Sequence, residues 1–216
     1  MVSEIIAVVI GYLLGSIPSA YIVARLAKGG DIRRMGGGNV GGLNVYREVG
    51  AWPALVVGIA DVGKGVAAVA IAYWLLGISP PWVLAAALAA VIGHMWMVFL
   101  KFGGGKGMGT TVGALAILQP LYGYWQGLAI FLGIVLVLFI ITRNVALAMG
   151  VAIAFLPLVI WLLTKSGMAT TFAIVLGLLV ALKFLPTARA ALAKAGSTKE
   201  FVFDDGKEDK DKKEGI

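Results

Sequence analysis

Long apolar stretches, joined by short polar connections, dominate the chain. They lie near residues 2–26, 52–77, 82–100, 107–119, 121–141, 145–164 and 167–185. A helix needs roughly 20 apolar residues to cross the hydrocarbon core of a bilayer, and most of these stretches approach that length. The fourth stretch is short and glycine-rich, so it would be tilted or shielded by its neighbours. The pattern predicts an all-α integral membrane protein with seven transmembrane helices.

Composition supports this class and excludes several kinds of chemistry. Of 216 residues, 60% are hydrophobic and only 13% are charged, whereas soluble domains carry about 25% charged residues. A transmembrane β-barrel would need strands of alternating polarity, and the Leu/Ala/Val runs here do not alternate. The absence of cysteine removes disulfides, thiol nucleophiles and thiolate metal sites. A single histidine removes a multi-histidine metal site within one chain.

The first apolar stretch differs from a cleavable signal peptide. It begins with Glu4 and has no lysine or arginine before its apolar part, so the basic leading region is missing. We therefore expect a retained helix. Its sequence "GYLLG", from Gly11 to Gly15, has small residues four apart, a spacing that lets two membrane helices approach closely.

Charge divides the chain into a basic body and an acidic tail. The net charge is +7, and residues 196–216 hold five lysines against seven acidic residues, which leaves +9 on residues 1–195. We expect a membrane domain over residues 1–195 and a disordered tail over 196–216, solvated or able to dock a partner. The basic body fits anionic lipids or an anionic substrate, or it reflects only the lysine and arginine excess that orients membrane helices.

Basic residues in the connections predict the orientation of the helices. One side of the membrane receives Arg25, Lys28, Arg33, Arg34, Arg47, Lys101, Lys106, Arg143 and the tail, and the other receives only Lys165. Because lysine and arginine accumulate in cytoplasmic loops, we expect the N-terminus outside and the C-terminus in the cytoplasm. The glycine-rich loops then lie on the cytoplasmic side.

The first polar loop, "RRMGGGNVGGLNVYR" at residues 33–47, matches a dinucleotide-binding pattern only superficially. Gly36, Gly38 and Gly41 have the G-x-G-x-x-G spacing, and Asp61 follows twenty residues after Gly41. That fingerprint requires a preceding strand and a βαβ unit, and here the flanking segments are membrane helices. The pattern is therefore not interpreted as a nucleotide site.

A phosphate site is the simpler interpretation of this loop. Glycines allow backbone N–H groups to turn together toward an anion. Asn39 and Asn44 can donate hydrogen bonds, and Arg47 can hold a phosphate with two parallel bonds.

A second glycine-rich stretch, "FGGGKGMG", places Lys106 directly after Gly104 and Gly105 and before Gly107. It is not a P-loop, because Gly107 stands where serine or threonine is required. It still puts a lysine among glycines just before a helix start, where an anion is favoured. The two loops would form one shared anion site or two neighbouring ones.

Two further polar features lie inside apolar stretches. Asp61 and Lys64 in "DVGKG" are three residues apart, so their side chains can pair on one helix face. Charges at this depth are functional or form a buried structural ion pair. His94, the single histidine, either handles protons or packs as a hydrogen-bonded core residue.

The motifs "GSIPSAYIVAR", "DIRRMGGGNVGGLNVYR", "DVGKG" and "GHMWMVFLKFGGGKGMGTT" resemble those of the bacterial acyl-phosphate-dependent glycerol 3-phosphate acyltransferases, the PlsY type. The resemblance covers roughly residues 1–185. It implies an inner-membrane enzyme that transfers a fatty acyl group from acyl phosphate to glycerol 3-phosphate and yields lysophosphatidic acid. Its partners would be these substrates and membrane lipids, with no nucleic acid, metal or cofactor.

The resemblance also implies roles for the residues described above. It implies catalytic roles for Arg47, Lys106 and His94, with Asp61 and Lys64 as a supporting pair. The phosphate-binding residues would be Gly37, Gly38, Asn39, Asn44, Gly104, Gly105 and Gly107.

The chain departs from the family pattern at four positions. A phosphate-contacting serine of the family is replaced by Gly37, and a threonine by Leu43. In an ungapped alignment of the seventh stretch, a family histidine falls on Phe184 and an asparagine on Thr187, with Arg189 nearby. The acceptor site would then be rebuilt for glycerol 3-phosphate or another acceptor, or the protein would bind lipid phosphate without catalysis. A transporter is a further alternative, although the chain lacks the internal repeat that transporters often show.

Overall fold

The computed structural model describes residues 1–194. The predicted tail, residues 196–216, lies outside the described residues. The helices of the described part are α1 (Val2–Ser16), α2 (Ser19–Lys28), α3 (Gly42–Glu48), α4 (Ala51–Ala70), α5 (Pro80–Met95), α6 (Met108–Leu121), α7 (Trp125–Thr142), α8 (Val145–Thr164) and α9 (Gly167–Lys194). Short 3-10 turns η1 (Ile32–Arg34) and η3 (Val98–Leu100) lie in the loops, and a π-helical turn η2 (Ile71–Leu75) continues α4.

The helices confirm the predicted all-α membrane class. Six helical segments are long and apolar enough to cross a bilayer: Val2–Lys28, Ala51–Leu75, Pro80–Leu100, Trp125–Thr142, Val145–Thr164 and Gly167–Pro186. The seventh expected segment is α6, which is apolar but has only 14 residues. Residues 1–194 contain no β-strand. The described chain divides into two compact units, Met1–Trp125 and the residues from Gln126 onward.

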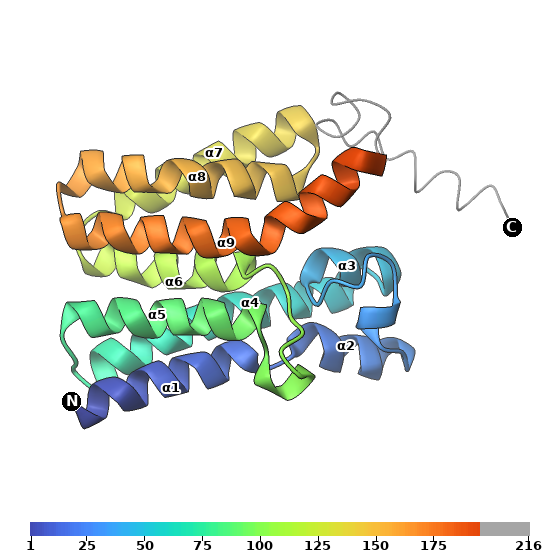
Figure 1. The fold of residues 1–216 in the computed structure, drawn as a ribbon, viewed down its shortest axis with the longest axis horizontal. Helices are drawn as coiled ribbons and strands as arrows, with labels where there is room; N and C mark the ends of the chain where they lie inside the picture. The colour runs from blue at the N-terminus through green and yellow to red at the C-terminus, as the bar shows by residue number, and fades with distance from the viewer. Residues whose placement is uncertain (195–216) are drawn as a thin grey trace, which may run out of the picture. The chain divides into compact units, whose positions relative to one another are not determined.

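The first apolar stretch is two helices rather than the single helix expected over residues 2–26. α1 ends at Ser16, Ile17 is extended, and α2 begins at Ser19 after Pro18. Proline lacks a backbone N–H and disfavours a helical conformation in the residue before it. The break directs α2 to the end of the unit that also carries α3, away from the N-terminus (Figure 1).

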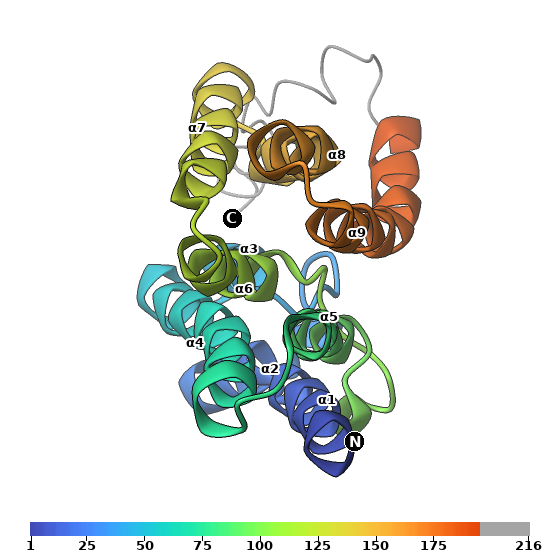
Figure 2. The same cartoon turned by 90° about the vertical axis from the view of Figure 1, so that its left-hand side faces the viewer.

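Glycines set the helix packing in the first unit. α5 packs along α1 and α6 along α4, and Figure 2 shows these four helices end-on. A methyl group added to Gly11 would meet the carbonyl oxygen of Ala86 at 2.5 Å, and one on Gly15 would overlap the carbonyl of Ala90. The predicted close approach at "GYLLG" is confirmed, because these contacts leave no space for a side chain.

A small apolar core supports the loops of the first unit. Its buried members come from α2, η1, α3, α4 and the residues around η3, and are Ala20, Ala24, Ile32, Val40, Val45, Val57, Met97 and Leu100. Val40 and Val45 belong to the first polar loop and α3, whereas Met97 and Leu100 belong to the connection between α5 and α6. The two polar loops are thus anchored in one core.

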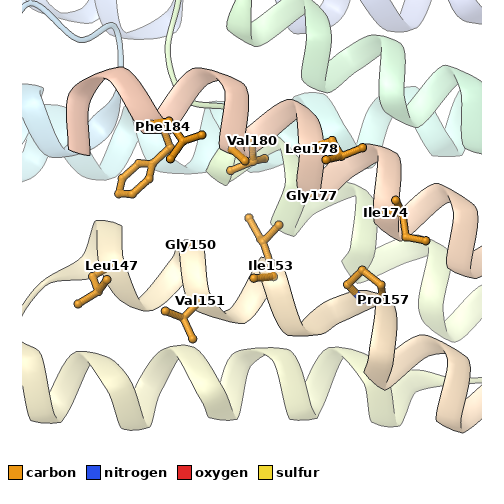
Figure 3. Close-up of a pocket in the computed structure, with 13 residues that line it drawn as sticks. Leu147, Gly150, Val151, Ile153, Pro157, Ile174, Gly177, Leu178, Val180 and Phe184 are labelled. Atoms are coloured by element: carbon orange, nitrogen blue, oxygen red, sulfur yellow. The ribbon is translucent and has the colours of Figure 1, made fainter. Parts of the chain in front are cut away.

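In the second unit, α8 packs against α9 and leaves an apolar groove of about 480 Å³. Gly150 and Gly177 lie on its two helices, and Leu147 and Phe184 lie at the same end (Figure 3). The lining is almost wholly aliphatic, and the volume falls in the range of small-molecule sites.

Candidate phosphate-binding site

The two glycine loops of the first unit touch each other. We call residues 35–41 the first glycine loop and residues 103–107 the second. A methyl group added to Gly105 would lie 2.5 Å from the carbonyl oxygen of Val40. Residues about 65 positions apart in the sequence are therefore in backbone contact, as a shared site requires.

The first glycine loop is organised by the side chain of Asn44. This side chain is buried, and its amide nitrogen donates to the backbone oxygens of Ile32, Met35 and Asn39 at 3.3, 3.1 and 3.0 Å. Sequence reasoning expected Asn44 to donate to a phosphate. In the structure its amide nitrogen donates to backbone carbonyls in and next to the loop, so Asn44 holds the loop in shape from its buried side.

The part of the first glycine loop around Gly37 is open. Gly38 has φ +69° and its N–H donates to the carbonyl of Met35 at 2.9 Å, closing a turn that favours glycine. A methyl group built on Gly37 meets no atom within 4 Å. The amide nitrogen of Asn39 lies beside Gly41, immediately before α3. Gly37 is therefore exposed on a surface with space for a ligand or a side chain.

The second glycine loop is close-packed instead. A methyl group on Gly104 would lie 2.5 Å from the carbonyl oxygens of both His94 and Met95. Gly105 abuts the Nε2 atom of His94, and its N–H donates to the His94 carbonyl at 3.0 Å. These two glycines are required because the backbone passes directly over the end of α5.

Helix α6 begins immediately after Lys106. Gly107 has φ +78° and precedes the first helical residue, Met108, without a side-chain cap. The first N–H groups of a helix have no partner within the helix, and they attract anions together with the helix dipole. Lys106 therefore stands beside a helix end suited to bind phosphate.

Lys106 and Arg47 lie close enough for their charges to interact. Burial lowers the pKa of Lys106 below its ordinary value of 10.5, and the positive charge of Arg47 lowers it further. Arg47 lies in the last turn of α3 and Lys106 in the second glycine loop, and two positive charges that influence each other favour the binding of an anion. The positive charge of Arg47 therefore acts on Lys106, the other cation that the sequence selects for the site.

Other basic residues near the first loop have local partners. Arg33 forms an ion pair with Asp31 at 2.7 Å and lies over the ring of Tyr21, and hydrogen bonds from Arg33 lower the pKa of Asp31 to about 2. Lys28 and Arg25 donate to the backbone carbonyls of Glu48 and Gly29. Their contacts stabilise loop and helix ends.

The expected ion pair between Asp61 and Lys64 is confirmed and has two further members. Lys64 Nζ lies 2.7 Å from Asp61 Oδ1, and both side chains are buried. Ser19 donates to the same carboxylate oxygen, and His94 Nδ1 lies 3.5 Å from it. Sequence reasoning assigned no role to Ser19, although it stands in the quoted motif "GSIPSAY".

Ser16 of the same motif also has a structural role that sequence reasoning missed. Its hydroxyl donates to the carbonyl of Gly93 and accepts from the N–H of Val98, both at 3.4 Å. Tyr12 donates to the carbonyl of Trp96 at 2.9 Å. The end of α1 therefore holds the chain where it leaves α5 toward the second glycine loop.

The departures in the seventh apolar stretch lie in the second unit. Phe184 lies on α9 and lines the apolar groove, close to Gly150 of α8 (Figure 3). Arg189 is exposed on α9, and the side chain of Thr187 lies outside the described residues. Phe184 thus contributes an apolar ring to this groove.

A family model described as glycerol-3-phosphate acyltransferase matches residues 5–194. The chain belongs to the glycerol-3-phosphate acyltransferase family. It is 44% identical over 198 residues to glycerol-3-phosphate acyltransferase 1 of Dehalococcoides mccartyi, covering 92% of this chain and 95% of that relative. It is 46% identical over 156 residues to glycerol-3-phosphate acyltransferase 2 of Moorella thermoacetica, covering 72% and 77% of the two chains.

Solved structures agree with this acyltransferase family. The chain resembles the glycerol 3-phosphate form of PlsY (YgiH), an integral membrane glycerol 3-phosphate acyltransferase, with a TM-score of 0.80 and 32% identity over 88% of this chain and 92% of that one. It resembles the lysophosphatidic acid form of PlsY with a TM-score of 0.77, 30% identity and the same coverage. The resemblance to PlsY that the motifs indicate is confirmed.

Proposed function

We propose that the protein is an acyl-phosphate-dependent glycerol 3-phosphate acyltransferase that produces lysophosphatidic acid at the membrane. Family membership and the likeness to PlsY in its glycerol 3-phosphate and lysophosphatidic acid forms support the acceptor and the product. The relatives' names do not state the acyl donor. We infer acyl phosphate as the donor from the sequence motifs and from the two cations, Arg47 and Lys106, which can bind phosphate groups.

The observation that carries the proposal is the contact between the two glycine loops at Gly105 and Val40, with Lys106 in the second loop and Arg47 on α3, the helix that follows the first loop. Both substrates bear phosphate groups, and both cations lie outside the membrane-spanning segments. Each cation would hold phosphate oxygens, Arg47 with its planar fork and Lys106 as a point charge. The first turn of α6 adds backbone N–H groups.

The reaction needs no covalent intermediate on the protein. The 1-hydroxyl oxygen of glycerol 3-phosphate attacks the carbonyl carbon of the acyl phosphate, and the bond between that carbon and the phosphate oxygen breaks. Phosphate leaves with the electron pair, and the hydroxyl proton passes to a phosphate oxygen. The protein contributes by holding the reactants together and by stabilising negative charge with Lys106 and Arg47.

The remaining site residues have supporting parts in this proposal. Gly37, Gly38 and Asn39 form the open face of the first loop, beside the acceptor phosphate. Asn44 keeps that loop in shape through its three hydrogen bonds. In the second loop, Gly104, Gly105 and Gly107 let the backbone pass over α5, against His94 and Met95.

We also propose that both glycine loops face the cytoplasm at the inner membrane, with the N-terminus outside. The absence of native cysteine permits a direct test. Gly37→Cys and Lys165→Cys would be treated in sealed cells with a thiol reagent that does not cross the membrane. We expect labelling of Lys165→Cys only, and labelling of Gly37→Cys alone would reverse the orientation.

Turnover by the purified protein tests the proposed reaction. The protein in lipid would be mixed with palmitoyl phosphate and glycerol 3-phosphate, and phosphate and lysophosphatidic acid would both be followed. We expect equal amounts of the two products, and loss of turnover by at least about 100-fold in Lys106→Ala with unchanged membrane insertion.

Other outcomes would select among the alternatives. Phosphate release from palmitoyl phosphate with a different phosphorylated alcohol, but not with glycerol 3-phosphate, would mean that the site around Gly37 and Leu43 binds that alcohol as the acyl acceptor. Binding of lysophosphatidic acid without product from any acyl phosphate would identify a non-catalytic lipid-phosphate-binding protein. Movement of solute across sealed vesicles without an acyl donor would identify a transporter.

A further inference from the structure

A buried polar cluster lies beneath the candidate site. It consists of Ser19, Asp61, Lys64 and His94, with side chains from α2, α4 and α5, and we call it the Asp61 cluster. All four residues are nearly inaccessible, with exposed fractions of 6%, 5%, 5% and 3%. Charged groups in such surroundings are expensive unless they are paired and hydrogen-bonded.

One carboxylate oxygen joins the whole cluster. Asp61 Oδ1 accepts from Ser19 Oγ at 2.5 Å and from Lys64 Nζ at 2.7 Å, and Lys64 also donates to Ser19 Oγ at 2.8 Å. His94 Nδ1 lies 3.5 Å from the same oxygen, and this buried nitrogen makes no hydrogen bond within the described residues. The carboxylate thereby ties the start of α2 to the middle of α4, and it lies beside the end of α5.

The cluster also contacts the chain just before and just after Lys106, at Gly105 and at Gly109. On one side, His94 contacts Gly105 through its ring and accepts the Gly105 N–H with its backbone carbonyl. On the other side, Gly109 lies so close to Asp61 that a methyl group there would be 3.0 Å from Asp61 Cβ. The segment that carries Lys106 is therefore supported at both ends by groups in contact with Asp61.

An isolated ion pair would not require this arrangement. Asp61 and Lys64 lie on the same helix, so their pairing alone links no two elements. Ser19 and His94 are the members that connect different helices. A purely structural pair could be replaced by apolar side chains with little loss, because buried ion pairs often contribute little net stability.

We propose that Asp61 positions the second glycine loop, with Ser19 and Lys64 holding its carboxylate and His94 and α6 transmitting its position to Lys106. The inference deepens the proposed function, on which its kinetic consequences rest. Asp61 and His94 are positioning residues in this view, and Lys106 is the residue that touches the substrate.

The test uses two variants. The first is the double variant Asp61→Leu with Lys64→Met, which leaves the net charge unchanged, and the second is the single variant Ser19→Ala. The matched control is Thr111→Val, which changes another fully buried hydroxyl in the first turns of α6, one without a hydrogen-bond partner. Each full-length variant would be purified in lipid. Unfolding temperature, amide hydrogen exchange of residues 103–109, and turnover of palmitoyl phosphate with glycerol 3-phosphate would be measured.

We expect the double variant to unfold within a few degrees of the native protein while its residues 103–109 exchange at least tenfold faster. Its kcat/KM should fall about 100-fold, because small displacements of catalytic groups cause losses of this size. Ser19→Ala should show the same pattern more weakly. Thr111→Val should leave both the exchange and the turnover near native values.

Native exchange and native turnover in the double variant would overturn the proposal and reduce the cluster to a structural pair. If the double variant fails to fold, Ser19→Ala decides by the same two measurements. If the native protein shows no turnover, the proposed function fails. The exchange of residues 103–109 then still tests the positioning role by itself.

Discussion

Glycine meets different physical needs in the two loops that form the candidate site. In the first loop, Gly37 has no neighbour within 4 Å of the position of a β-carbon, and Gly38 adopts a turn with positive φ. In the second loop, Gly104 and Gly105 are pressed against the carbonyls and the imidazole at the end of α5. Gly38 of the first loop thus serves a turn, whereas Gly104 and Gly105 of the second loop serve close packing.

The difference shows that runs of glycine with similar sequences need not respond alike to substitution. The first loop takes its shape from Asn44, which holds three carbonyls from the buried side. The second loop takes its shape from contacts with His94, which itself lies beside Asp61. Variation is therefore easier to accommodate at Gly37 than at Gly105.

The largest expected effect comes from Gly105→Ala. The new methyl group would overlap the His94 ring and the Val40 carbonyl, so we expect destabilisation by about 1–3 kcal/mol and nearly complete loss of turnover. Thermal unfolding and the palmitoyl phosphate assay measure the two effects. The control Gly37→Ala should change stability by less than about 0.5 kcal/mol. Equal effects of the two variants would contradict the contrast between the loops.

A substantial effect is expected from Arg47→Lys. The lysine keeps the positive charge but loses the planar fork that binds two phosphate oxygens. We expect KM for glycerol 3-phosphate to rise about tenfold, which corresponds to about 1.4 kcal/mol. Arg47→Ala should raise it further. If Arg47→Lys retains the native KM, Arg47 supplies charge alone.

The pH dependence of substrate binding should report the proximity of Arg47 and Lys106. Lys106 binds phosphate as the protonated amine, and its pKa is lowered first by burial and second by Arg47. Affinity is therefore complete below this lowered pKa and declines as pH rises through it. In Arg47→Gln, one cause of the lowering is removed, so the alkaline decline in 1/KM should move to higher pH. A decline at unchanged pH would mean that the two loops bind phosphate independently.

The smallest expected effect is a gain from Gly37→Ser. The space beside Gly37 accepts a side chain, and a hydroxyl there could donate to the acceptor phosphate. Hydrogen bonds to charged groups contribute about 1.5–3 kcal/mol, from which the cost of ordering the side chain is subtracted. We expect KM for glycerol 3-phosphate to fall by up to about tenfold at unchanged stability. Gly37→Ala separates the hydroxyl from the methylene, and an equal gain in that variant would exclude the hydrogen bond.

Much of the fold followed from local pattern. Apolar length identified the membrane segments, and the small-residue spacing from Gly11 to Gly15 identified a close helix contact. The expectation of one continuous helix over residues 2–26 was wrong, because the helix ends at Ser16 and resumes at Ser19, although Val2–Lys28 is long and apolar enough to cross a membrane. The apolar residues continue through the break, so hydrophobicity alone does not reveal it, whereas Pro18 marks its position.

The charged residues of the candidate site could be predicted from the sequence, whereas the hydrogen bonds that hold its loops in place could not. A lysine among glycines before a helix, and an arginine in a glycine-rich loop, carry recognisable chemistry within a few residues of sequence. The use of the Asn44 amide within its own loop was not predictable, because its acceptors are backbone carbonyls whose direction depends on the folded loop.

The amino-acid sequence by itself determined the membrane class, the family, the two loop cations and the Asp61–Lys64 pair, because each depends on composition or on residues a few positions apart. Tertiary structure alone decided that the two loops meet and that Ser19, Asp61 and His94 form one cluster. These residues are separated by 42 and 33 positions along the chain. Their proximity results from the packing of α2, α4 and α5, which no local pattern encodes.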